Sequence, residues 1–277
     1  MTPDQYCEQK TRQSGSSFYY SFLFLPKDKR RAMTALYAFC REVDDVVDEC
    51  TDMNVARMSL AWWRGQVNEI YDGTPQHPVA LALVPVVRQF SLDKEHLLEI
   101  IAGMEMDLYK NRYDSFEELK LYCYRVASVV GLLSARIFGY SDEKTLIYAH
   151  DLGIAFQLTN IIRDVGEDAQ RGRIYLPQDE MKQYGIHVND VLNYRESPEF
   201  IKLMQFQVER AQQYYRQALA ELPPADRKAQ RTGLIMAAIY RTTLDEVVDS
   251  GLHVLREHVS LPAVRKLWLA FKTWLRN

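Results

Sequence analysis

Apolar residues recur at intervals of three and four along nearly the whole chain, which is the spacing of one face of an amphipathic helix. Short stretches rich in Gly, Pro and polar residues interrupt the pattern at 71–78, 138–143, 170–180, 195–199 and 221–227. We find no Val-, Ile- and Thr-rich run with the two-residue alternation of a strand, and no internal repeat. None of the interruptions has the length of an interdomain linker. The pattern therefore predicts an all-α fold in which residues 1–277 form a single domain, a bundle of helices around one interior.

The segment 27–49 is predicted to be a helix with an unusual polar face. Pro26 and Asp28 mark its start, and no helix breaker follows up to Glu49. On a helical projection one stripe is apolar and contains Met33, Leu36, Cys40, Val43 and Val47. A second stripe contains Tyr37, Arg41, Asp44 and Asp48, with Asp45 at its edge. Carboxylates at i and i+4 repel each other by a few tenths of a kcal/mol. We therefore expect a partner that offsets the repulsion; the alternative is a solvated acidic face paired with Arg41.

A second acidic stripe lies in the segment 153–177. The projection places on one side Gln157, Asn160, Asp164 and Asp168, and on another side Ile154, Leu158, Ile162 and Val165. Nearby in sequence are Arg163, Arg171 and Arg173. Two helices with such stripes can face each other across a cavity and hold divalent cations. Oxygen ligands without His or Cys select a hard ion, and Mg²⁺ prefers one or two carboxylates plus substrate phosphate. The predicted ligand is a diphosphate, held where metal and arginines reverse the field of the carboxylates.

Composition and charge narrow the class of protein. A net charge of −3 and a pI near 6.1 give no general attraction to nucleic acid. The first ten residues, MTPDQYCEQK, lack the apolar core of a signal peptide, and a chain of this size does not need its four cysteines as disulfide staples. No stretch approaches the about 18 uninterrupted apolar residues of a membrane span. We expect a cytoplasmic protein with reduced thiols that does not cross a bilayer.

Four segments resemble the head-to-head prenyl synthases, the family of squalene, phytoene and dehydrosqualene synthases. They are SGSSFYYSFLFLP (14–26), YAFCREVDDVVDE (37–49), YCYRVASVVG (122–131) and QLTNIIRDVGEDAQRGRIYLP (157–177). The two Asp-rich blocks match that family in order and spacing. The resemblance implies a helical bundle of the isoprenoid-synthase type around a central apolar cavity.

The resemblance also implies roles for individual residues. The Asp-rich blocks and one neighbouring amide would bind metal: Asp44, Asp45, Asp48, Asn160, Asp164 and Asp168. Asp48 and Asp164 would be the metal ligands at the ionising centre, which Tyr122 would approach. Tyr37 and Arg41 would order the diphosphate. Further substrate contacts are expected from Ser17 and Phe18 at the pocket mouth, from Tyr240 on a later helix, and from Gln157, Asn160, Arg163 and Arg173.

Within the family, GSSFYYSFLFLP and YCYRVASVVG are most similar to the bacterial presqualene diphosphate synthases of the hopanoid pathway. For the phytoene branch we would expect a small or uncharged residue at Arg125 and Gly near Ser128. This resemblance implies that the allylic carbon–oxygen bond of one farnesyl diphosphate ionises with the help of Mg²⁺. The double bond of a second farnesyl diphosphate attacks the cation, and proton loss closes a cyclopropane. The apolar stripes would keep water from the cation.

Three other functions remain open at this stage. A phytoene or dehydrosqualene synthase of carotenoid biosynthesis would use the same chemistry, and a complete squalene synthase would add reduction by a nicotinamide. We find no Gly-rich phosphate loop, so the sequence gives no support for nicotinamide binding. The non-enzymatic alternative is a helical protein that binds cations or a partner through its acidic stripes, and it predicts no diphosphate release.

Two further segments carry weaker signals. Asp245 and Asp249 repeat the i, i+4 spacing, but Gly251 follows at a helix-stop position, which favours a solvated helix end over a third metal site. The segment 263–277 is amphipathic, with an apolar face of Val264, Leu267, Trp268, Phe271, Trp274 and Leu275. It is expected to dock on the domain; peripheral membrane contact is the alternative, because Trp, Leu and basic residues suit an interface. The sequence does not reveal the oligomeric state.

Overall fold

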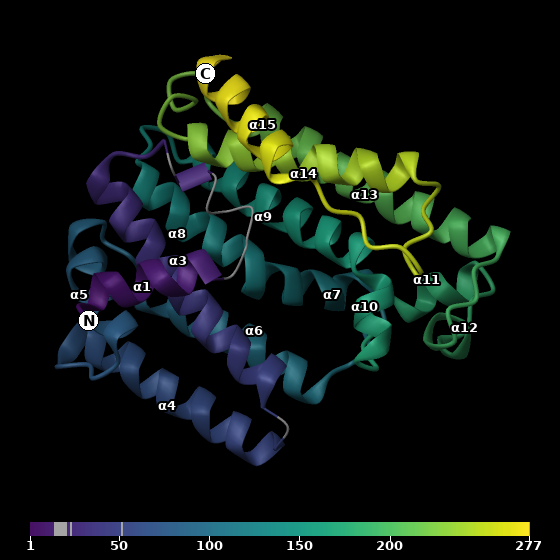
Figure 1. Cartoon of the computed structure of the whole chain (residues 1–277), viewed down its shortest axis with the longest axis horizontal. Coiled ribbons are helices and arrows are strands. Elements are labelled where there is room, and N and C mark those ends of the chain that lie inside the picture. The colour runs from purple at the N-terminus through teal and green to yellow at the C-terminus, as the bar shows by residue number, and fades with distance from the viewer. Residues whose placement is uncertain (14–20, 23, 51, 277) are drawn as a thin grey trace.

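A computed structural model describes residues 1–13, 21–22, 24–50 and 52–276, and every long regular element in these ranges is a helix (Figure 1). The elements are α1 (Pro3–Gln13), α3 (Lys27–Glu49), α4 (Met53–Asp72), α5 (Pro78–Gln89), α6 (Lys94–Tyr109), α7 (Phe116–Cys123), the π-helix η1 (Tyr124–Ser128), α8 (Val129–Phe138), α9 (Lys144–Arg163), α10 (Val165–Gln170), α11 (Gln178–Gln183), α12 (Val188–Leu192), α13 (Pro198–Glu221), α14 (Arg231–Asp249) and α15 (Ala263–Arg276). The all-α prediction is confirmed.

The predicted interruptions coincide with helix ends. Gly73 follows α4 and its N–H donates to the carbonyl of Glu69, which closes the last turn. Gly139 and Gly251 follow α8 and α14 with φ of 81° and 84°, a left-handed conformation that favours glycine at the position after a helix. At the start of α13 the Ser197 hydroxyl accepts a hydrogen bond from a backbone N–H of the first turn.

Helix α9 lies at the centre of the fold, with η1 and α8 on one side and α13 and α14 on the other (Figure 1). Its apolar residues point in both directions and are buried, among them Leu152, Ile154, Ala155, Leu158 and Ile162. A buried Leu truncated to Ala typically costs about 2–5 kcal/mol of unfolding free energy. The packing of α9 therefore fixes the positions of the polar residues at its C-terminal end.

Helices α7, η1 and α8 run on without a break from Phe116 to Phe138. This stretch is long and apolar enough to cross a membrane by length and composition, although we expected no such segment. Half of its most apolar window is buried, and it packs against α6 and α9. Gly103 and Gly153 allow the close approach, since a Cβ on them would lie 2.7 Å from Val126 Cγ1 and 2.5 Å from Ser128 Cα. The π turn is thus held between two neighbouring helices, and such turns occur often at functional sites.

Candidate active site

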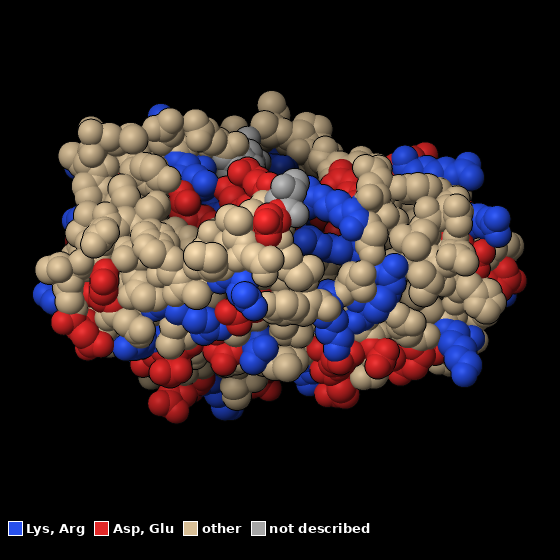
Figure 2. All heavy atoms as spheres, turned by 90° about the horizontal axis from the view of Figure 1, so that it is seen from below, with Lys and Arg blue, Asp and Glu red and all other residues tan. Residues whose placement is uncertain are grey.

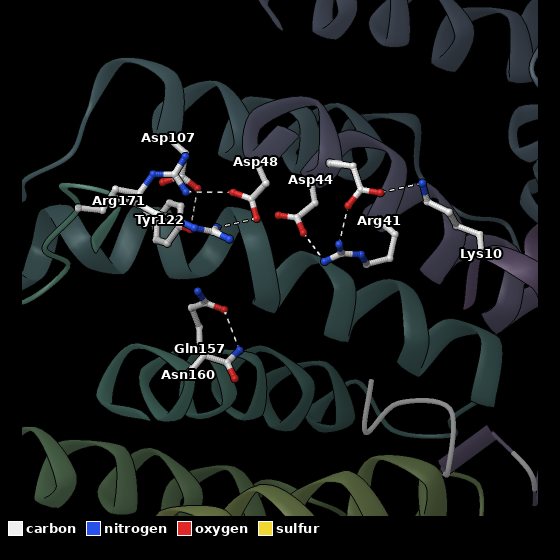
Figure 3. A network of polar contacts seen from close by, with 11 residues as sticks. Lys10, Arg41, Asp44, Asp48, Asp107, Tyr122, Gln157, Asn160 and Arg171 are labelled. Atoms are coloured by element: carbon white, nitrogen blue, oxygen red, sulfur yellow. Dashed lines mark hydrogen bonds and ion pairs between the residues drawn. The ribbon is translucent and has the colours of Figure 1, made fainter. Parts of the chain in front are cut away.

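The carboxylates of α3 are held by cations on the same helix and on its neighbour (Figure 3). The Arg41 guanidinium donates to Asp44 Oδ2 and to Asp45 Oδ1, each at 2.5 Å. The other oxygen of Asp45 lies 2.7 Å from Lys10 Nζ on α1. Asp45 therefore faces α1, while Arg41 and Asp44 line the acidic cleft described below.

Asp48, one turn after Asp44, contacts the segment that follows α10. Its two oxygens lie 3.0 Å from Arg171 Nη1 and 3.1 Å from Arg173 Nη1. Arg173 is well covered, with a side chain 17% exposed, whereas Arg171 is 57% exposed. These ion pairs join the two acidic segments across the cleft.

The second acidic segment is not one continuous helix. Helix α9 ends at Arg163, Asp164 has φ −102° and ψ 12°, and α10 begins at Val165. The N–H of Gly166 donates to the carbonyl of Val254 at 3.1 Å, and a Cβ on Gly166 would lie 2.6 Å from Leu255 O. The approach of the later loop, which only glycine permits, replaces a helical hydrogen bond. The helical projection used for this segment was therefore wrong past Arg163, but both aspartates still face the cleft.

A set of polar side chains from six segments lines this cleft, which holds about 360 Å³. Its lining includes Arg41, Asp44, Asp48, Asp107, Tyr122, Gln157, Asn160, Arg163, Asp164, Asp168, Arg171, Arg173 and Tyr175. Figure 2 shows acidic and basic side chains gathered in a hollow on the corresponding face of the molecule. The two predicted stripes therefore do face each other.

An apolar cavity of about 190 Å³ adjoins the cleft. The two spaces share four lining residues, Cys40, Val126, Gln157 and Asn160. The cavity continues between α8, α9 and α14 towards Phe138, Tyr148 and Gln230. Tyr37, predicted to order the diphosphate, and Tyr240, predicted as a further substrate contact, both line this apolar part. Tyr240 packs there against Phe156 with ring centroids 4.7 Å apart. The site thus combines a charged end with an apolar end.

Burial shifts the protonation of two predicted metal ligands. Desolvation raises the pKa of Asp44 to about 6, with Arg41 opposing the shift and Asp48 adding to it. Desolvation and the charge of Asp164 raise the pKa of Asp168 to about 7. A nearby cation would reverse these shifts, because it favours the ionised carboxylate.

The donor set fits a hard divalent cation. Asp44, Asp48, Asp164 and Asp168 offer carboxylates to one cleft. Asn160 Oδ1 is buried and accepts no hydrogen bond among the described residues, although its amide nitrogen lies 3.4 Å from Gln157 Oε1. A buried acceptor without a donor costs free energy, and a metal ion or a metal-bound water would satisfy it. These are the ligand types that Mg²⁺ accepts.

Asp164 is also held from its outer side. Both of its oxygens accept hydrogen bonds of 2.6 Å from Arg163. His258 Nδ1 lies 3.7 Å from the same carboxylate and 2.9 Å from Glu167. Arg163 thus lines the cleft paired with Asp164, and its contact with substrate stays a prediction.

One group in the cleft was missed by the sequence analysis. Asp107 on α6 accepts hydrogen bonds from the hydroxyls of Tyr122 and Tyr175, both at 2.8 Å. Burial raises its pKa to about 6, while the two hydroxyls oppose the shift. In the sequence, the one sign of a special role for Asp107 is a carboxylate placed between the apolar residues Met106 and Leu108.

Two predicted residues, Ser17 and Phe18, lie outside the described ranges. Asp245 and Asp249 are exposed on α14 and are not part of the cleft lining. Their placement agrees with a solvated helix end. The metal and substrate roles of the cleft residues stay predictions.

Comparisons with known proteins agree on the family that this chain is similar to. The family model described as squalene/phytoene synthase matches residues 11–265. A phytoene synthase of Arthrospira platensis is 38% identical and the alignment covers 94% of this chain and 89% of the relative. A 15-cis-phytoene synthase of Synechocystis sp. is 36% identical over 98% of this chain and 84% of the relative.

Solved structures of two further proteins superpose closely. A dehydrosqualene synthase in complex with a ligand has a TM-score of 0.85 at 28% identity, covering 99% of this chain and 96% of that one. The squalene synthase HpnC from Alicyclobacillus acidocaldarius has a TM-score of 0.81 at 27% identity, covering 90% and 94%.

Proposed function

The chain belongs to the squalene/phytoene synthase family of prenyltransferases, and from that premise we propose that it joins two farnesyl diphosphates head to head and releases presqualene diphosphate. The observation that carries the proposal is the continuity of the charged cleft with the apolar cavity through Val126, Gln157 and Asn160. A prenyl diphosphate has the same two-part character. Its diphosphate fits the charged end and its hydrocarbon tail fits the apolar end.

The chain's own residues supply binding and protection. The guanidinium groups of Arg41, Arg163 and Arg173 line the cleft and suit bidentate contacts with phosphate oxygens. Asp44, Asp48, Asn160, Asp164 and Asp168 would hold Mg²⁺, which when bound withdraws charge from the leaving diphosphate. Asp45 would act indirectly, by fixing Arg41 between α3 and α1. The apolar walls of the cavity exclude water from the carbocation.

Likeness to enzymes that make thirty-carbon products supports farnesyl diphosphate as substrate. The dehydrosqualene synthase and HpnC structures align over 90% or more of this chain. At the position where we expect a small or uncharged residue in the phytoene branch, Arg125 Nε donates to Glu99 at 2.8 Å. The pair joins α6 to the π turn beside the cleft.

Phytoene synthesis from geranylgeranyl diphosphate is the second candidate. The curated relatives at 36–38% identity are named phytoene synthases, over nearly the whole chain. The chemistry would be the same, and the length of the prenyl tail would differ.

Product analysis decides between these functions. Purified protein with Mg²⁺ and NADPH is given farnesyl or geranylgeranyl diphosphate, and the products are identified by mass spectrometry. We expect presqualene diphosphate from farnesyl diphosphate, with hydroxysqualene as a minor solvolysis product. Turnover of geranylgeranyl diphosphate alone would identify a phytoene synthase. Squalene as the main NADPH-dependent product would identify a complete squalene synthase, and no diphosphate release from either substrate would refute an enzymatic function.

We further propose that α15 docks on an anionic bilayer at the cytoplasmic face of the membrane. One side of the helix packs on α14, and Ala270 is buried (Figure 1). Trp274 stacks on Phe24, which precedes α3, with ring centroids 5.8 Å apart. The opposite side exposes a set of apolar residues, Val264, Leu267, Trp268, Phe271 and Leu275. The helix has four basic residues and no acidic one in a chain of net charge −3. This charge favours anionic lipid headgroups as the partner.

Vesicle sedimentation tests the docking. Binding to vesicles with phosphatidylglycerol should exceed binding to phosphatidylcholine vesicles, and Trp268→Glu with Phe271→Glu should abolish it. The matched control is Val55→Glu with Met58→Glu, two exposed apolar residues of α4. Unchanged vesicle binding by the α15 variant would refute the proposal. It would also be refuted if the parent bound no vesicles and the substitutions in α15 instead abolished a dimer seen in light scattering.

A further inference from the structure

The apolar cavity ends at Tyr148 of α9, whose hydroxyl adds nothing to the stability of the fold. The residue is 1% exposed and lines the cavity beside Phe138 and Gln230. Its hydroxyl is buried and has no hydrogen-bond partner among the residues that the structure describes. A buried hydroxyl without a partner costs free energy, and a phenylalanine would fill almost the same space without that cost. The length of this side chain therefore points to a use in the cavity itself.

The Tyr148 hydroxyl reaches the backbone of α14. A Cβ on Gly233 would lie only 2.6 Å from that oxygen, so the tyrosine fits because position 233 is a glycine. Gly233 lines the same cavity. On the other side α8 is equally close, since a Cβ on Gly131 would lie 2.5 Å from the carbonyl oxygen of Ala149. Helices α8, α9 and α14 thus meet around Tyr148 and close this end of the cavity.

Helix α9 spans the distance from the charged cleft to this closed end. Successive turns of the helix line the cavity, with Asn160, Gln157 and Phe156, Gly153 and Leu152, and Ala149 and Tyr148. Asn160 also lines the cleft, and Tyr148 precedes it by twelve positions, which is about 18 Å of helix. An extended isoprene unit is about 5 Å long, close to the pitch of a helix. Three units therefore fit before the closed end, and a fourth would meet the tyrosine ring.

Resting on the head-to-head chemistry proposed above, we propose that Tyr148 is the end stop for a hydrocarbon tail in this cavity and selects farnesyl over geranylgeranyl diphosphate. The diphosphate is held at the charged end, so the depth that the tail reaches is set by its number of isoprene units. A geranylgeranyl tail would have to displace the Tyr148 ring, and the close backbones of α8 and α14 leave that ring no room. Tyr148 is thus a specificity-determining residue that takes no part in bond making.

A comparison of the two substrates tests the end stop. The parent, Tyr148→Phe, Tyr148→Leu and Tyr148→Ala are given farnesyl or geranylgeranyl diphosphate with Mg²⁺, and kcat/KM for diphosphate release is measured. The parent should favour farnesyl diphosphate. The ratio should shift toward geranylgeranyl diphosphate in the order Phe, Leu, Ala, because a phenol group has more heavy atoms than an isoprene unit. In Tyr148→Ala the shift should be at least ~10-fold, the scale on which apolar pockets discriminate by size, with a forty-carbon product in mass spectrometry.

Phe200→Ala is the matched control, since Phe200 is also a fully buried ring but lines neither the cavity nor the cleft. It should keep the substrate ratio of the parent, and thermal melts check that each variant is folded at the assay temperature. Tyr148→Leu, the milder truncation, keeps the test valid where Tyr148→Ala does not fold.

An unchanged ratio in the folded Tyr148→Leu and Tyr148→Ala variants would overturn the end stop, and so would an equal shift in Phe200→Ala. A parent that forms presqualene diphosphate but uses both substrates equally well would also overturn it. A parent that forms no presqualene diphosphate from farnesyl diphosphate would instead refute the proposed function.

Discussion

Asp48 provides a strong test of the site, because its substitution should lower the free energy of unfolding only slightly but should lower turnover greatly. In Asp48→Asn the ion pairs with Arg171 and Arg173, at 3.0 and 3.1 Å, are lost. The Asp48 side chain is 27% exposed, and partly exposed pairs of this kind contribute about 0.2–1 kcal/mol each. We therefore expect a loss of about 1 kcal/mol in unfolding free energy, which lowers Tm by roughly 2–4 °C.

Turnover should respond far more strongly. As a metal ligand at the ionising centre, Asp48 should cost at least ~100-fold in diphosphate release when changed to Asn, which corresponds to about 2.7 kcal/mol of barrier. Asp164→Asn should do the same. Turnover is followed by diphosphate release at saturating Mg²⁺, and stability by thermal unfolding of the same samples.

The control is the double variant Asp245→Asn with Asp249→Asn, which removes two carboxylates of the same i, i+4 spacing from the exposed end of α14. It should retain most activity. Near-normal turnover of both Asp48→Asn and Asp164→Asn would refute the metal-site assignment, and a deep loss in the double variant would show that those aspartates had been misjudged.

Three more outcomes follow from the geometry. In EDTA the free energy of unfolding should rise as pH falls from 8 to 6. The folded-state pKa values of Asp44 and Asp168, about 6 and about 7, exceed those of the unfolded chain. Proton binding therefore stabilises the fold, and this stabilisation is lost as pH rises through the folded-state pKa values. Thermal melts should show this trend flattened in Asp168→Asn and by added Mg²⁺; a slope of the opposite sign would contradict it. Asp226→Ala should cost about 3 kcal/mol in denaturant unfolding, since donors from Ser141, Asp142 and Thr145 lose their acceptor. Gly166→Val should lower both stability and turnover, because its side chain would meet the carbonyl of Leu255; an unchanged melting temperature would show that the loop yields freely.

The helices were predictable from the sequence because their ends carry local signals. The turn around Gly139 and the start of α3 after Pro26 follow from φ preferences and capping, which act within a few residues. The acidic stripe of α3 and the two amides of α9 were predictable for the same reason, since a helical projection fixes which side chains share a face.

The projection failed where partners come from elsewhere in the chain. Asp45 sits at the edge of its stripe, and its direction is decided by Lys10 on α1. The end of α9 is decided by the loop that passes Gly166, almost ninety positions later in the chain. Asp107 accepts a hydrogen bond from Tyr175, which also comes from a distant segment of the chain. Such contacts depend on how distant segments pack together, and the periodicity of apolar residues within one segment gives no information about that packing.

If the cleft binds metal and diphosphate as proposed, the ion pairs of Asp48 with Arg171 and Arg173 would make the binding of cations and anions interdependent. A cation that takes the Asp48 carboxylate leaves two guanidinium groups without their counter-charge, and a diphosphate is then their strongest partner. A diphosphate that recruits Arg173 in turn frees the carboxylate for a cation. Each raises the affinity for the other by the same factor, as linkage requires. A cleft with the proposed metal site would therefore select the metal complex of a diphosphate over either component alone.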